Sequence, residues 1–339
     1  MEFLPTLWFV IIAYLWTGYL LLEGFDLGVG MLMKLFARNN DERRVLLNTV
    51  GPVWDGNEVW LITAGAATFA AFPQWYASLF STLYLPLLAV LIGLIFRAVA
   101  FEYRGKVDSA AWRNRWDWAI ALGSFVSAFG VGAALALTTT GLPINANGDR
   151  EGGPFSWFSG YALLGGFGVV LFCLVHAAAF LVLKTDGDIR ARARRLLLRW
   201  LPVALLPMAG WAIVVHLDGG KSVTWLTLGV AVAGAVYAWW TASRQRDGLS
   251  FTGMAVFLAG GTATIFTAAF PVVLPSIISS AFDLTVTNAS SSDYTLTVMS
   301  VVGLIGLPAV LVYQGWTYWV FRQRVRSGSI PQAHSVTAQ

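Results

Sequence analysis

Long apolar stretches are the feature of this sequence that most restricts its fold. A helix needs roughly 20 apolar residues to cross the hydrocarbon core of a bilayer, and nine stretches reach or nearly reach that length. We expect them at about residues 4–34, 50–72, 76–101, 116–139, 157–183, 199–216, 222–241, 250–274 and 294–321. The sequence therefore predicts an all-α polytopic membrane protein with about nine transmembrane helices. That number allows two four-helix bundles plus one peripheral helix.

The composition agrees, because 57% of residues are hydrophobic and only 12% are charged, whereas about a quarter are charged in soluble domains. A net charge of +4 would suggest nucleic acid binding in a soluble chain, but here the basic residues lie in short clusters between apolar runs. The first apolar run lacks a basic leader and is too long for a cleaved signal peptide, so we expect it to stay as the first span. Cys173 is the only cysteine, which excludes an intramolecular disulfide and a cysteine-held zinc or iron–sulfur site.

The basic residues predict the orientation of the chain. Of the 22 Lys and Arg, 20 fall in one alternating set of connections (34–48, 97–115, 184–199, 244–249) and after 321, and the other set holds Arg150 and Lys221. Cytoplasmic loops carry the excess of Lys and Arg. The N-terminus is thus predicted outside, with one transmembrane domain over 1–321 and a cytoplasmic tail over 322–339. The sequence contains no P-loop and no G-x-G-x-x-G fingerprint, which speaks against nucleotide-driven chemistry.

Two pairs of acids interrupt the first two apolar runs. Glu23 and Asp26 lie about 16 and 12 Å above the predicted cytoplasmic edge, and Asp55 and Glu58 lie about 10 and 15 Å in from it. Arg97 falls in the same layer. Each pair has i,i+3 spacing, so both members project from one helix face. Ionisable groups at such depth are expensive, and they face protein or water rather than lipid.

A proton path fits this layer, because four acids near one Arg should keep at least one proton bound or in exchange near neutral pH. The alternative is a purely structural ion network that holds the helices together at a net energetic cost. His176 falls at the same depth, about 12 Å from the edge. A single intramembrane His is more often a hydrogen-bonded packing residue than a proton relay or haem ligand. Asn57 is placed to bond a carboxylate across the gap.

The motifs of this chain closely resemble those of subunit II of the cytochrome bd-type quinol oxidases. The resemblance covers the whole length and is most specific in the first 130 residues. It is carried by Gly24-Phe-Asp-Leu-Gly-Val-Gly30, Asp41-Glu-Arg-Arg44, Trp54-Asp-Gly-Asn-Glu-Val-Trp-Leu-Ile-Thr-Ala-Gly65, Phe96-Arg97, Phe101-Glu-Tyr-Arg104, Trp112-Arg-Asn-Arg-Trp-Asp-Trp118, Phe270-Pro, Pro275-Ser and Leu296-Thr-Val-Met.

The resemblance implies a multi-pass protein of the bacterial plasma membrane in an obligate complex with a haem-bearing subunit I. That partner would hold two b-type haems, one d-type haem (or a third b-type) and the quinol site. The resemblance also allows for small single-span accessory subunits and for a quinone bound in this chain at residues that cannot be assigned. The chain has three His, His176, His216 and His334, too few to ligate three haems. We therefore expect no metal and no haem ligated by this chain.

Matching positions make Asp55 of Trp-Asp-Gly-Asn the best candidate for the proton path, with Glu23 and Asp26 next and Arg97 as counter-ion. Glu58 departs from the family pattern, where a Gln is expected in some relatives, as Glu23 departs from an Asp. The preferred hypothesis is a subunit of a complex in which two quinols reduce O2 to water with protons from the cytoplasmic side. The alternatives are a free-standing proton-coupled transporter or channel, and a purely structural scaffold for subunit I.

Overall fold

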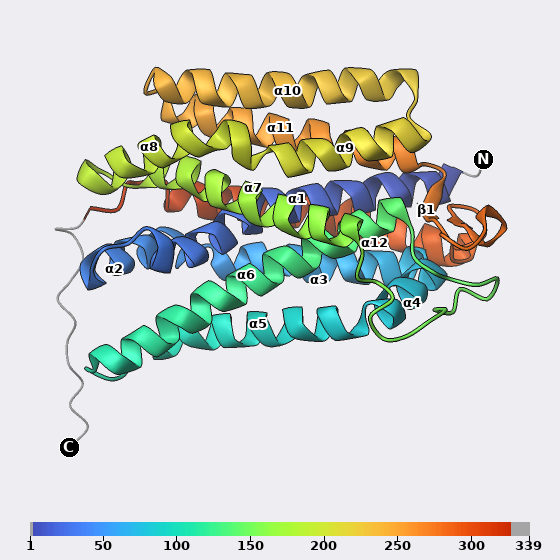
Figure 1. Ribbon diagram of the computed structural model, residues 1–339, viewed down its shortest axis with the longest axis horizontal. Coiled ribbons are helices and arrows are strands. Elements are labelled where there is room, and N and C mark those ends of the chain that lie inside the picture. The colour runs from blue at the N-terminus through green and yellow to red at the C-terminus, as the bar shows by residue number, and fades with distance from the viewer. Residues whose placement is uncertain (1–2, 327–339) are drawn as a thin grey trace.

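The structure is a computed structural model that describes residues 3–326. Within these residues, eight helical segments are long and apolar enough to cross a membrane, and they run side by side along the long axis of the molecule (Figure 1). They are α1 (Phe3–Leu35), α5 (Tyr84–Tyr103), α6 (Ala110–Thr140), α7 (Gly160–Lys184), the joined α8 (Gly187–Ala204) and α9 (Leu206–Gly219), α10 (Ser222–Ser243), α11 (Asp247–Ala269) and α12 (Asp293–Val320). The polytopic all-α class is confirmed.

The predicted stretch 50–72 corresponds to α3 (Trp54–Ala71), which is not among these eight segments. Asp55, Asn57 and Glu58 lie near its start, and these residues lower its mean hydropathy. A separate helix, α2 (Asn40–Val50), precedes it. The number of helices that cross the membrane stays a prediction.

Several boundaries differ from those expected, and prolines account for most of the differences. Pro52 lies in the turn between α2 and α3, where its ring nitrogen has no N–H to continue the hydrogen bonds of α2. The predicted stretch 76–101 is divided at Leu83 into α4 (Pro73–Thr82) and α5, and Pro86 lies in the first turn of α5. A break at Leu205 separates α8 from α9, with Pro207 in the first turn of α9. Prolines are tolerated there because the first-turn N–H groups lack intrahelical partners.

The helices form two groups, which meet where α1 and α6 pack against α7. On one side α1 packs against α3 and α6, and α6 packs against α5; on the other, α7 packs against α8, α9 and α11, and α11 packs against α10. Glycines allow the closest approach between the groups: a Cβ added at Gly28 of α1 would lie 1.9 Å from the carbonyl oxygen of Cys173 on α7. Helix α12 is peripheral, and Leu296 is its one fully buried residue.

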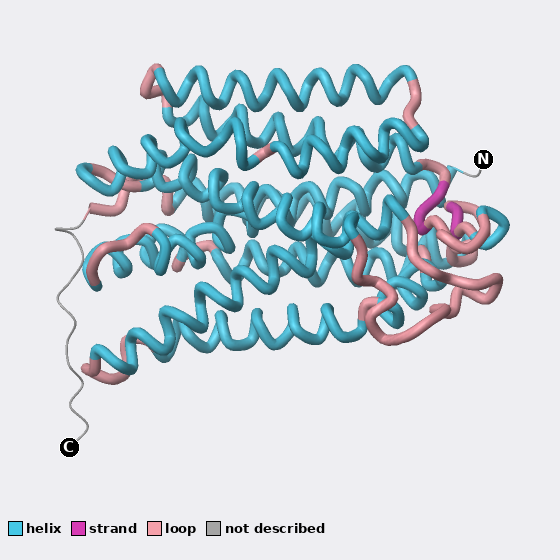
Figure 2. The backbone as a smooth tube through the Cα atoms, in the orientation of Figure 1, coloured by secondary structure: helices cyan, strands magenta, loops and turns pink. Residues whose placement is uncertain are grey.

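The connections collect at the two ends of the bundle (Figure 2). At one end, the loops after α6 and α11 join through hydrogen bonds from Leu142 N to the carbonyl of Pro275 and from Ile277 N to the carbonyl of Leu142. The loop after α11 also forms a two-stranded hairpin of β1 (Val272–Leu274) and β2 (Leu284–Thr285). The other end holds the basic connections. The orientation relative to the cytoplasm stays a prediction, and residues 327–339 of the predicted tail, including His334, lie outside the described part.

Candidate functional site

Glu23 and Arg97 form a fully buried ion pair at the centre of the predicted acid layer. Nη1 of Arg97 lies 2.8 Å from Oε1 of Glu23, and neither side chain has exposed surface. Glu23 comes from α1 and Arg97 from α5, and both helices pack against α6. A Cβ added at Gly123 of α6 would lie 3.2 Å from Cβ of Arg97. The absence of a side chain at Gly123 thus makes room for the guanidinium within the helices.

Glu58 joins the pair from the side of the bundle. Its Oε1 lies 3.7 Å from the same Nη1 of Arg97, and 16% of its side chain is exposed. One guanidinium therefore contacts a carboxyl group in the core and another that reaches the protein surface. Glu58, where the resemblance led us to expect a Gln in some relatives, is part of the cluster.

Asp26 is buried one helical turn from Glu23 on α1, and it pairs with an amide rather than with Arg97. Its Oδ2 accepts a hydrogen bond of 2.6 Å from Nδ2 of Asn57 on α3. This confirms the expected contact between Asn57 and a carboxylate. The structure thus brings together four of the five predicted site residues: Glu23, Asp26, Glu58 and Arg97.

The fifth, Asp55, is exposed, and no contact between its side chain and Glu23, Asp26 or Arg97 is present in the described chain. Helix geometry explains the difference. Successive residues turn by about 100°, so residues two apart point about 200° away from each other. Because Asn57 points into the bundle, Asp55 must point out of it. The estimate of depth from the helical rise contained no information on rotation about the helix axis.

Polar residues of α12 complete the cluster, and sequence reasoning missed them. Gln314 donates from Nε2 to Oδ1 of Asn57 at 2.9 Å, and the hydroxyl of Tyr318 donates to the same oxygen at 2.7 Å. Trp60 of α3 donates from its indole to Oε1 of Gln314 at 3.3 Å. A glutamine inside an apolar run was the available signal, since buried polar groups need partners.

His176 is a packing residue in this structure. Its Nε2 lies 2.9 Å from the carbonyl oxygen of Leu21, and its ring stacks on Phe172 and Phe251 with centroids 5.0 and 4.9 Å away. At the far end, Nδ1 of His216 lies 2.6 Å from the hydroxyl of Thr224. Each of the two described histidines thus has one ring nitrogen in a protein hydrogen bond.

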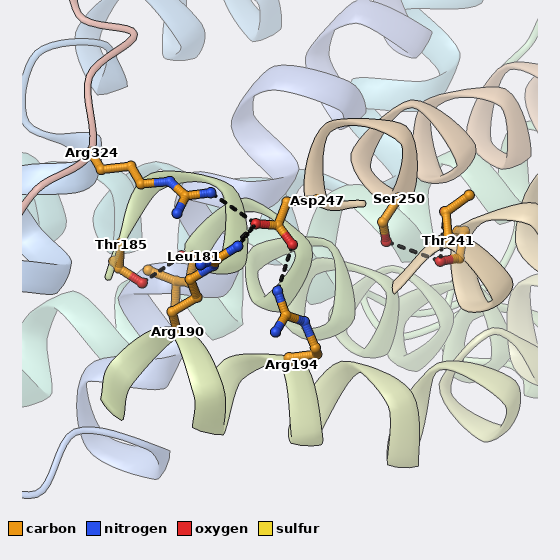
Figure 3. A network of polar contacts seen from close by, with 9 residues as sticks. Leu181, Thr185, Arg190, Arg194, Thr241, Asp247, Ser250 and Arg324 are labelled. Carbon is orange, nitrogen blue, oxygen red and sulfur yellow. Dashed lines mark hydrogen bonds and ion pairs between the residues drawn. The ribbon is translucent and has the colours of Figure 1, made fainter. Parts of the chain in front are cut away.

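Ion pairs of a different kind stabilise the basic end of the bundle. Asp247, at the start of α11, receives the guanidinium groups of Arg190 and Arg194 from α8 and of Arg324 from the segment after α12 (Figure 3). Four donors occupy one carboxylate, which is about the number it can accept. This network connects the segment after α12 to α8 and α11.

Glu42 belongs to the same end. It pairs with Nη2 of Arg192 at 2.7 Å and accepts from the backbone N–H of Arg38 at 2.8 Å. Burial alone would raise the pKa of the Glu42 carboxyl, but these two donors outweigh it and the pKa is lowered. The charged form of Glu42 is thus favoured in the folded protein.

An apolar cavity of about 650 Å³ that opens at the protein surface lies between α1, α3, α4, α5 and α6. Its walls include Trp16, Phe69, Tyr76, Tyr84 and Leu91. The hydroxyls of Thr68 and Thr138 in the wall donate to carbonyls of their own helices, so they offer little to a ligand. Among residues 3–326 there is no group of three or more His, Cys, Asp or Glu placed to hold a metal ion.

Comparison with known proteins gives consistent matches over nearly the full chain. Residues 4–321 match the family model of cytochrome bd terminal oxidase subunit II. The chain is 41% identical over 330 residues to "Cytochrome bd ubiquinol oxidase subunit 2" of Bacillus subtilis (strain 168), covering 96% of this chain and 98% of that protein. It is 32% identical over 374 residues to "Cytochrome bd-I ubiquinol oxidase subunit 2" of Escherichia coli (strain K12), covering 99% of each. A chain of the bd oxidase structure from Geobacillus thermodenitrificans has the same fold, with a TM-score of 0.74 at 18% identity over 94% of this chain and 98% of that one.

Proposed function

Because the chain belongs to the cytochrome bd terminal oxidase subunit II family, we propose that its buried acids carry protons for the reduction of oxygen. Membership makes it a subunit of an oxygen-reducing quinol oxidase in a bacterial membrane, in complex with a subunit 1. A free-standing transporter or channel is not favoured, because the family assembles into this complex. The reaction assigned to the complex takes electrons from two quinols and consumes four protons for each O2 reduced to water.

The observation that carries the proposal is the double contact of Arg97. Its guanidinium pairs with the fully buried Glu23 and approaches the partly exposed Glu58. The three buried or half-buried carboxyls Glu23, Asp26 and Glu58 lie near this single guanidinium. With all three ionised the layer carries unbalanced negative charge, and two bound protons neutralise it. Unbalanced charge in a low-dielectric interior is costly. A proton that exchanges between carboxyls relieves this cost.

Asp55 has a different role in the proposed path. It is exposed one helical turn from Glu58 on α3, so it can collect protons at the surface and pass them to Glu58. From there, carboxyl exchange beside Arg97 leads to Glu23 and then to Asp26. The hydroxyl of Tyr19, one turn before Glu23, is buried without a hydrogen-bond partner among the described residues. Such a group can bind a proton-conducting water.

Turnover of the assembled oxidase tests this path. Glu23→Gln and Asp55→Asn keep the side-chain shape and remove the titrating proton, so each should lower oxygen consumption by about tenfold or more. Asp218→Asn, at an exposed carboxylate on α9, is the matched control and should leave turnover unchanged. Haem absorbance of each purified complex measures assembly. Full turnover in assembled Glu23→Gln and Asp55→Asn complexes would reject the path, and lower assembly with normal turnover would support the scaffold function instead.

The support of subunit I is proposed for α12. This helix buries only Leu296 within the described chain, and most of its apolar side chains are exposed. A helix with so little packing on its own chain gains stability from a partner. Cysteine crosslinking from α12 positions such as Val302 and Val312 to subunit I, with α10 position Val236 as control, tests this assignment. We place the two b-type haems and the d-type haem in subunit I, as membership of the family implies.

The apolar cavity is the proposed place for a quinone in this chain. Its volume of about 650 Å³ lies in the usual range for small-molecule sites, and its lining suits a ring with a prenyl chain. Solvent extraction of the purified complex should yield more quinone than the amount held by subunit I. Leu91→Trp, which fills the cavity, should lower that excess, while unchanged quinone content would reject this site. Small accessory subunits remain a further proposed class of partner.

A further inference from the structure

The side-chain amide of Asn57 joins three helices beside the buried acids. Its Nδ2 donates to Oδ2 of Asp26 at 2.6 Å and to the carbonyl of Leu22 at 3.3 Å, both on α1. Its Oδ1 accepts from Gln314 at 2.9 Å and from Tyr318 at 2.7 Å, both on α12. An amide offers two N–H donors and two acceptor sites. Every hydrogen-bonding position of this fully buried residue is therefore used.

The direction of these bonds is determined by Trp60. An indole N–H can only donate, so the carbonyl oxygen of Gln314 faces Trp60 and the NH2 group of Gln314 faces Asn57. The carbonyl oxygen of Asn57 then receives two donors, which leaves its NH2 group for Asp26. Rotating the Asn57 amide by half a turn would place its oxygen against the carboxylate of Asp26 and the carbonyl of Leu22, both acceptors.

This arrangement makes the two oxygens of Asp26 different. Oδ2 holds the Asn57 hydrogen bond, whereas Oδ1 is buried without a hydrogen-bond partner among the described residues. We propose that Asn57 is a positioning residue that directs the proton of Asp26 to Oδ1, and that Gln314 and Tyr318 hold the Asn57 amide in the required orientation. The inference rests on the proton path proposed above and extends it to α12.

The position of α12 gives this arrangement a second consequence. Gln314 and Tyr318 lie on its inward side, while the rest of the helix is mostly exposed. The same helix therefore presents one side to the proposed partner and supplies two donors to the amide beside Asp26 with the other. Because Gln314 and Tyr318 hold the Asn57 amide, we expect docking of subunit I on α12 to affect the orientation of Asn57.

Infrared difference spectroscopy of the assembled oxidase, recorded between oxidised and reduced states, tests the positioning role. The carboxyl bands of Asp26 are those that disappear in Asp26→Asn. Asn57→Leu and Tyr318→Phe should shift these bands and lower turnover, roughly tenfold for loss of the bond to the carboxylate and roughly fivefold or less for loss of the tyrosine donor. Tyr237→Phe, on α10 at the far side of the molecule (Figure 1), is the matched control and should change neither.

The outcomes separate this inference from the proton path. Unshifted Asp26 bands in assembled Asn57→Leu, or the absence of any band that Asp26→Asn removes, would overturn the positioning role. Full turnover in Asp26→Asn would instead remove Asp26 from the path, whatever the bands show. Should Asn57→Leu fail to assemble, Tyr318→Phe decides the question, because it keeps the aromatic ring and removes one donor.

Discussion

Removing the guanidinium of Arg97 should destabilise the protein far more than removing the whole ion pair. Nη1 of Arg97 and Oε1 of Glu23 are 2.8 Å apart and fully buried, a separation at which two unit charges attract by about 6 kcal/mol for an effective dielectric constant of about 20. Desolvation costs several kcal/mol for each ion, so the pair contributes little net stability. Arg97→Gln alone leaves Glu23 without this attraction, and we expect the free energy of unfolding to fall by about 3–5 kcal/mol.

Denaturant titration of the purified complex in detergent, followed by haem absorbance and by the fluorescence of this Trp-rich chain, measures the effect. The double variant Arg97→Gln with Glu23→Gln removes both charges and should recover most of the loss. Arg113→Gln, which breaks the more exposed pair with Asp108, is the control and should change stability by less than about 1 kcal/mol. A loss below about 1 kcal/mol in Arg97→Gln, or no recovery in the double variant, would refute this account of the pair.

Three further changes test the packing and the basic end. Glu42→Gln should lower the free energy of unfolding by about 1 kcal/mol at neutral pH. Because folding lowers the pKa of Glu42, the stability that its charge contributes is lost as the carboxyl becomes protonated. The difference in stability between Glu42→Gln and the wild type should therefore disappear as the pH falls below about 4. Asp247→Asn leaves three guanidinium groups without their carboxylate. It should lower the free energy of unfolding by about 1–3 kcal/mol, a range that allows for the partial exposure of these groups. Asp108→Asn is the control and should change it little in the same titration. Gly28→Ala places a methyl 1.9 Å from the carbonyl of Cys173 and should lower the yield of assembled complex on size-exclusion chromatography, whereas Gly105→Ala, with open space around it, should not.

The sequence predicted the helical class because apolar length is a property of the chain alone. It could not place the divisions within the stretches, since these depend on how neighbouring helices pack. The break at Leu205 shows this: the apolar run continues through it, and only Pro202 and Pro207 on either side suggested a change. The helix α2 was missed because its charged residues looked like part of a connection. Its burial of Val45 and Leu46 follows from docking against the ends of other helices.

The sequence predicted how far along their helices the site residues lie, but not the direction in which their side chains point. Rise along a helix placed all five predicted site residues in one layer, and the structure gathers four of them: Glu23, Asp26, Glu58 and Arg97. The same estimate applied to Asp55, because depth is independent of rotation about the axis. Gln314 and Tyr318 could not be assigned, since their partner Asn57 is more than 250 residues away in the chain. Long-range pairing of this kind is decided by tertiary packing.

The angular positions of residues around the axis of α3 also explain how one short segment contributes both to the buried core and to the protein surface. Asn57 and Trp60 are three residues apart and both are buried, whereas Asp55 points to the opposite side and is exposed. Glu58 is about 60° from Asp55 around the axis and lies at the boundary, with part of its side chain exposed and Oε1 near Arg97. In the proposed path, a proton received at Asp55 changes sides within one helical turn to reach Glu58 and the core. A relative with Gln at position 58 would lack this carboxyl, so its path would require water at the same boundary.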